Sequence, residues 1–158
     1  MFRLLNPLGS HGGAQNLTQG FGENPEFYTP ITGRPGHSGI DLGIPVGTPV
    51  RSAACQEGHV VTARTSKPEE GLGNYVLTEH PPCREYPAGY QVLYGHPSRV
   101  NVVANAKVSP GQNIGLSGNT GRSTGPHLHF GLKDLGCKDN EWDGYTDPSP
   151  YVLSLIHI

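Results

Sequence analysis

The sequence has few charges and no long apolar run. Its 158 residues include only 11 Lys+Arg and 13 Asp+Glu, which gives a net charge of −2 at pH 7. Nucleic acids and anionic membranes are bound by clusters of positive charge, so this balance argues against both kinds of partner. No stretch has the length of a transmembrane helix, and the first residues lack the apolar run of a signal peptide. We therefore expect no nucleic-acid partner and no transmembrane segment.

Cysteine is also scarce, with only Cys55, Cys83 and Cys137 and no CxxC spacing. Three thiols can form at most one intrachain disulfide, and their number does not indicate a cellular compartment. Two interpretations stay open at this point. The three cysteines are unpaired, or a bridge joins Cys83 and Cys137, which both fall in predicted loops.

Glycine and proline, in contrast, are abundant, with 23 and 15 residues. So many backbone breakers leave little room for long helices. The apolar residues come instead in short runs separated by turns, at 58–63, 74–78, 90–94 and 127–133. With 34% apolar residues, the chain is long enough to bury a core. We predict one all-β domain, mainly antiparallel sheet with long loops.

Three histidine-containing motifs are candidates for chemistry. His127 and His129 fall in a predicted strand, where side chains at i and i+2 share one face, so they suit one metal site as two ligands or as a ligand and an acid/base. His37 and Asp41 lie four apart among glycines, and zinc accepts such mixed nitrogen and oxygen ligands. His96 ends an apolar run. Each motif alone also fits a purely structural role.

Taken together and in this order, the motifs resemble the M23 family of zinc metallopeptidases, the lysostaphin-like or LytM-type endopeptidases of peptidoglycan. The resemblance covers roughly residues 19–132. It implies a β-sandwich or partly open barrel of the LytM/lysostaphin type, with a zinc site in a groove. Further segments resemble the family's framework strands and the close of such domains: 47–50, 73–76, 111–118 and 147–151.

The resemblance implies a ligand set for one zinc ion per chain. His37, Asp41 and His129 take the positions of the family's zinc ligands. Three protein ligands leave a fourth position for water, which is the arrangement of a catalytic zinc site rather than of a closed structural one.

The resemblance also implies the catalytic groups. His96 and His127 match the family's two catalytic histidines, and which of them is the general base stays open. Tyr28 precedes His37 by nine residues, a spacing at which some lysostaphin-like enzymes carry a tyrosine that steadies the oxyanion. The alternative for Tyr28 is an aromatic side chain that only packs.

The chain is expected to divide into three parts. Residues 1–18 are an N-terminal extension, and residues 19–152 form the M23-like peptidase domain. Residues 153–158 match an in-frame translation of a sequencing-adapter end, so we interpret them as a non-native scar. An ordinary short apolar tail is the other interpretation.

The implied function is a zinc-dependent endopeptidase that hydrolyses peptidoglycan stem peptides or cross-bridges by metal-activated water with histidine acid/base assistance. The alternative is a non-catalytic LytM-like module that binds cell wall or activates a partner hydrolase. A cupin-like barrel also carries HxH but leaves His37 and Asp41 unexplained. We expect a monomer acting in the extracellular or periplasmic wall space, or delivered by a phage.

Overall fold

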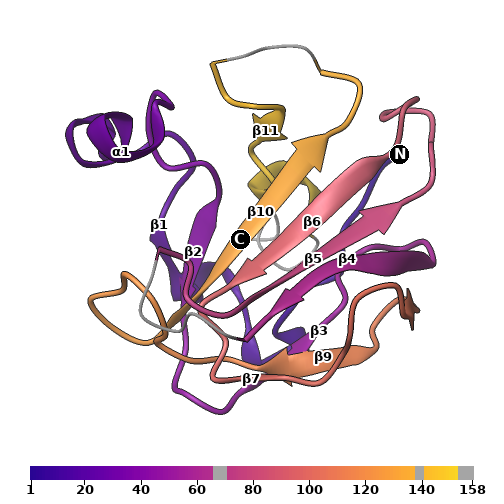
Figure 1. Cartoon of the computed structure of the whole chain (residues 1–158), viewed down its shortest axis with the longest axis horizontal. Helices are drawn as coiled ribbons and strands as arrows, with labels where there is room; N and C mark the ends of the chain where they lie inside the picture. Colours follow the sequence, from indigo (N-terminus) through magenta and orange to yellow (C-terminus); the bar gives the residue numbers. More distant parts are fainter. Residues whose placement is uncertain (66–70, 138–140, 153–158) are drawn as a thin grey trace.

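The computed structural model describes residues 1–65, 71–137 and 141–152, and regular structure within these ranges is mostly β (Figure 1). One α-helix and three short 3₁₀ turns accompany the strands. The helix is α1 (Pro25–Thr32), and the 3₁₀ turns are Gly9–His11, Ala14–Asn16 and Ser149–Tyr151. The strands are β1 (Leu17–Gln19), β2 (Ile40–Gly43), β3 (Pro49–Arg51), β4 (Gly58–Arg64), β5 (Tyr75–His80), β6 (Tyr90–Gly95), β7 (Arg99–Val100), β8 (Lys107–Val108), β9 (Asn113–Leu116), β10 (His127–Asp134) and β11 (Tyr145–Thr146).

The strands form two antiparallel sheets. The larger has eight strands in the order β1-β2-β10-β6-β5-β4-β8, with β11 added along β10, and the smaller has the order β3-β9-β7. The longest strand, β10, lies between β2 and β6, so its residues are fixed in register from both sides. The predicted all-β, mainly antiparallel architecture is confirmed, and the sheets do not close into a barrel.

Side chains from both sheets share one hydrophobic core. The inward face of β10 supplies Leu128, Phe130 and Leu132, each fully buried, and the smaller sheet supplies Val50 and Ile114. Strand β5 alternates between buried and half-exposed positions, as expected for a strand with one face on the core. The core therefore fixes which face of each strand is buried and which face can carry functional side chains.

The segment predicted as an N-terminal extension also contributes to this core. Phe2, Leu4 and Leu8 are buried, and the Phe2 ring makes edge contacts with the rings of Tyr86 and Tyr90 at 4.7 and 5.0 Å. Residues 1–18 thus pack against the rest of the chain. The proposed boundary at residue 19 stays a prediction, and the expected scar at 153–158 lies outside the described residues.

The three cysteines are all free, with Cys83 half-buried and Cys55 and Cys137 exposed. The bridge considered between Cys83 and Cys137 is therefore not formed in this structure. In the described part of the chain, no helix is both long and apolar enough to cross a bilayer.

The helix α1 was not expected from the sequence. Pro25 at its first turn favours helix initiation, but Pro30 lies inside it and none of its residues is buried. Its eight residues offer a single apolar pair at helical spacing, Phe27 and Ile31, which is too short a pattern to predict a helix. Gly33, with φ 77°, ends the helix in the left-handed conformation.

Candidate metal centre and active site

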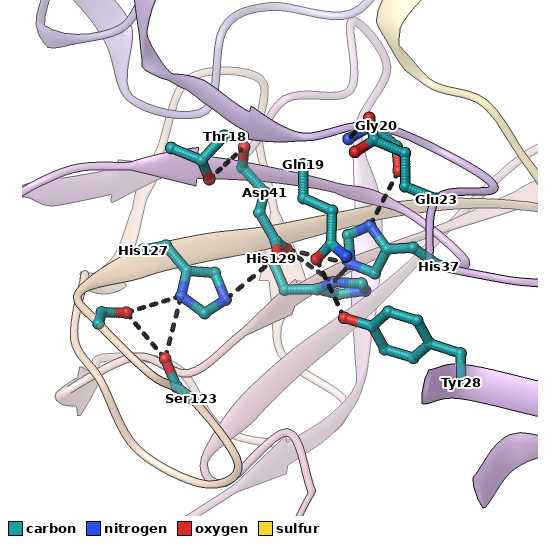
Figure 2. Close-up of polar contacts among 11 residues, drawn as sticks. Thr18, Gln19, Gly20, Glu23, Tyr28, His37, Asp41, Ser123, His127 and His129 are labelled. Carbon is teal, nitrogen blue, oxygen red and sulfur yellow. Dashed lines mark hydrogen bonds and ion pairs between the residues drawn. The ribbon is translucent and has the colours of Figure 1, made fainter. Parts of the chain in front are cut away.

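Three side chains bring their ligand atoms together on one face of the paired strands β2 and β10 (Figure 2). His37 Nε2 lies 3.0 Å from His129 Nδ1 and 3.1 Å from Asp41 Oδ1. His129 Nδ1 and Asp41 Oδ1 are 3.2 Å apart. Ligand bonds of about 2.0–2.1 Å in a tetrahedral zinc site place neighbouring ligand atoms roughly 3.3 Å apart. The trio therefore fits one face of a tetrahedral site, and it is the single such group among the described residues.

Strand register explains how two of these ligands meet. Asp41 in β2 is paired with His129 in β10, so both side chains leave the sheet on the same face. His37 lies in the loop before β2, where its backbone N–H donates to the carbonyl of Glu23 at 2.9 Å. Gly39 separates this loop from the strand. A Cβ at Gly39 would come within 2.9 Å of the His129 ring and closer still to a backbone carbonyl, so only glycine fits there.

The protonation of the trio suits a cation. His37 Nδ1–H donates to the carbonyl of Gly20 at 3.2 Å, which leaves Nε2 unprotonated toward the other two ligands. Burial lowers the pKa of His129 and favours its neutral form. Burial alone would raise the pKa of Asp41, but its close contacts with the His129 and His37 rings lower it well below its usual range. The site thus holds a carboxylate and two imidazoles.

His96 and His127 lie beside the trio, with their ring centroids 4.6 Å apart. His96 Nδ1–H donates to the carbonyl of Thr120 at 2.6 Å, and His127 Nδ1–H donates to the carbonyl of Gly125 at 2.8 Å. In a neutral imidazole each bond leaves Nε2 as the unprotonated nitrogen, and Nε2 of His127 is 3.6 Å from Asp41 Oδ2. Burial, followed by the neighbouring histidines, lowers the pKa of His96 to about 4, so it is neutral at neutral pH.

Tyr28, on α1, lies against the other side of the trio. Its ring centroid is 5.0 Å from that of His37, and its hydroxyl donates to Gln19 Oε1 at 3.0 Å. Burial, and then the charge of Asp41, raises the pKa of Tyr28, so the hydroxyl keeps its proton. Sequence reasoning missed Gln19, because a single glutamine in β1 carries no motif; only the pairing of β1 with β2 brings it here.

All six predicted site residues line one cavity of about 1110 Å³. Phe27 and Ile31 of α1 also line it, as do Arg122 and its neighbours in the loop before β10. The structure thus brings together every side chain singled out from the sequence. The individual roles of these side chains stay predictions.

Comparison with known proteins agrees with this geometry. Residues 35–141, more than half of the chain, match the sequence profile of peptidase family M23. The chain therefore belongs to peptidase family M23.

Several characterised members are similar to it. Over 110 residues the chain is 43% identical to the peptidoglycan DD-endopeptidase ShyA of Vibrio cholerae, covering 69% of this chain and 23% of that protein. It is 35% identical over 139 residues to the glycyl-glycine endopeptidase ALE-1 of Staphylococcus capitis, covering 88% of this chain and 34% of that one. The chain spans about a quarter of the length of the DD-endopeptidase relatives that it matches.

Solved structures show the same fold. The catalytic domain of lysostaphin from Staphylococcus simulans superposes with a TM-score of 0.68 at 32% identity, over 90% of this chain and 99% of that one. A zinc-containing peptidase from Vibrio cholerae gives a TM-score of 0.62 at 36% identity, over 83% of this chain and 37% of that one.

Proposed function

We propose that this chain is a zinc-dependent endopeptidase that hydrolyses peptide bonds in the stem peptides or cross-bridges of bacterial peptidoglycan. The observation that carries the proposal is the convergence of three ligand atoms within 3.2 Å of one another, beside two further histidines in a single cavity. The named relatives act on peptidoglycan or on glycyl-glycine bonds, which supports this substrate class.

His37, Asp41 and His129 would hold the metal through Nε2, Oδ1 and Nδ1. Zinc bound there supplies Lewis-acid chemistry, because it acidifies water and polarises a carbonyl group. The mixed nitrogen and oxygen donor set, with one carboxylate among two neutral imidazoles, is typical of catalytic zinc sites.

The remaining groups move protons and stabilise charge. In their neutral forms His96 and His127 each present an unprotonated Nε2, so either can take a proton from the attacking water and return it to the leaving amine. The protonated hydroxyl of Tyr28 can donate to the carbonyl oxygen as negative charge develops on it. All these groups come from one chain, so a monomer is sufficient for activity. A peptidoglycan substrate implies action in the extracellular or periplasmic wall space, and delivery by a phage is another way for the protein to reach it.

The test is mass spectrometry of the soluble muropeptides released from purified walls of several cross-link types. The zinc-loaded protein should release peptides with a new amino terminus, EDTA should stop the release, and added zinc should restore it. A His127→Ala protein is the matched control. Release of glycan fragments with intact cross-links, or no release from any wall, would contradict the proposal.

A further inference from the structure

The cavity has two unlike walls on either side of the metal-binding trio. Figure 2 shows Tyr28 of α1 on one side of the trio and Ser123 of the loop before β10 on the other. The α1 wall is apolar, since Phe27 and Ile31 lie one helical turn apart and about half of each side chain is exposed. The loop wall is polar and carries an exposed arginine, Arg122.

The charges that line the cavity do not balance. Asp41 is the one acidic residue among its described lining residues, and it belongs to the trio. The charge of Arg34 is compensated, because its Nη2 and Nε lie 2.9 and 3.0 Å from Asp143 Oδ2 and its guanidinium lies over the Tyr145 ring. With a divalent cation on the trio, the cavity therefore has an excess of positive charge to which Arg122 contributes. Such a cavity attracts an anionic ligand.

The backbone that carries Arg122 is held firmly. Its N–H donates to the carbonyl of Gly71 at 2.6 Å. The preceding Gly121 has φ +74°, and a Cβ there would collide with the backbone of Gly73. The turn at Gly121 therefore packs directly on the turn at Gly71 and Gly73. The Arg122 side chain extends from this fixed backbone at the lining of the cavity. Among the described residues, none forms an ion pair with Arg122.

We propose that Arg122 is a specificity-determining residue that binds a free carboxylate of the substrate close to the scissile amide. The preferred substrate class would then be a cross-link whose acceptor residue is a diamino dicarboxylic acid, rather than a neutral glycine bridge or an amidated acceptor. A planar guanidinium pairs with a carboxylate through two parallel hydrogen bonds, which a carboxamide cannot reproduce. This inference rests on the proposed endopeptidase function.

The experiment compares two synthetic cross-linked dimers that differ only in a carboxylate or a carboxamide on the acceptor residue. The wild-type enzyme should prefer the carboxylate in kcat/KM by about fivefold to thirtyfold, mainly through KM. Arg122→Gln should lose this preference by losing activity on the carboxylate dimer alone, and Arg122→Lys should keep part of it. Arg99→Gln, at an exposed arginine on β7, is the matched control and should behave as wild type. Raising the salt concentration should narrow the preference.

A second readout does not need turnover. Calorimetric titration of zinc-loaded His127→Ala protein, which should not cleave the dimers, should show tighter binding of the carboxylate form, and adding Arg122→Gln should abolish the difference. Equal cleavage of both dimers by the wild-type enzyme, or an unchanged preference in Arg122→Gln, would overturn this inference while leaving the endopeptidase function intact. Failure of the zinc-loaded enzyme to cleave either dimer or any wall would instead overturn the proposed function.

Discussion

His37 Nε2 and His129 Nδ1 lie 3.0 Å apart, although 92 positions separate the two residues in the chain. One belongs to a glycine-rich loop and the other to β10, an interior strand of the larger sheet. Two nitrogen atoms that each carry a lone pair have little reason to meet unless a proton or a cation lies between them. Asp41 completes the group with an oxygen at a similar distance from both.

Removing any one of these three ligands should remove the metal. His37→Ala, Asp41→Ala and His129→Ala should each weaken zinc binding by more than about 100-fold, since even loss of an outer hydrogen-bond partner costs 10- to 100-fold. Zinc content after dialysis, measured by plasma mass spectrometry, checks this. His11→Ala, at an exposed histidine, is the control and should stay loaded. Stoichiometric zinc in all three ligand variants would refute the assignment.

The two remaining histidines of the cavity should matter for turnover and not for metal retention. His96→Ala and His127→Ala should keep near-wild-type zinc and lose about 10²–10⁴ in kcat. If both serve one proton-transfer step, the double variant should lose less than the product of the single losses. Exposed His59→Ala is the control. Full wall-lytic activity of His127→Ala would exclude its catalytic role.

Glycine at position 39 should be required for the close approach of the His37 loop to β10. Gly39→Ala places a methyl group against the His129 ring and a backbone carbonyl, so we expect a loss of about 1–3 kcal/mol in unfolding free energy together with weaker zinc binding. Thermal denaturation and metal content measure the two effects. Gly125→Ala, where a Cβ meets no atom within 4 Å, is the matched control. Equal stability of the two variants would show that the loop can move aside.

Acid should destabilise the fold through a histidine far from the metal centre. His80 is buried, its Nδ1–H donates to the carbonyl of Gln56 and its Nε2 accepts from the Thr78 hydroxyl. Burial lowers its pKa from 6.5 to about 4. Below pH 6.5 the unfolded chain therefore binds a proton that the folded one does not. Stability should fall as pH drops from 6.5 to about 4, by on the order of 3 kcal/mol, and no further from this group below that range.

Urea denaturation of metal-free protein at several pH values measures this loss. His80→Gln is less stable at neutral pH but should show a shallower pH dependence than the wild type. An identical slope in the two proteins would assign the acid sensitivity to other groups.

The sequence predicted which side chains gather in the cavity better than it predicted their surroundings. His37, Asp41, His96, His127 and His129 were found because short motifs among glycines keep a fixed spacing in the chain. The all-β class followed from short apolar runs between breakers, which is a local property. These features need no knowledge of long-range packing.

Other features depend on contacts between distant segments and gave no local signal. The helix α1 buries no side chain, contains an internal proline and offers a single apolar pair at helical spacing, Phe27 and Ile31. Gln19 and Arg122 are ordinary polar residues until strand pairing and turn packing bring them to the cavity. Phe2, Leu4 and Leu8 lie in the apolar first eight residues, and only the tertiary structure shows that this segment packs into the core.

One face of strand β10 packs in the hydrophobic core, and the other face lines the cavity with two histidines of the candidate site. Leu128, Phe130 and Leu132 are fully buried among apolar side chains, and His127 and His129 point to the cavity. Inserting or deleting one residue in this strand would exchange the two faces at once, driving imidazoles into the core and leucines into the cavity. This strand can therefore vary by substitution but not by length. Changes of length should be tolerated better in the loops between strands, where no strand face shifts.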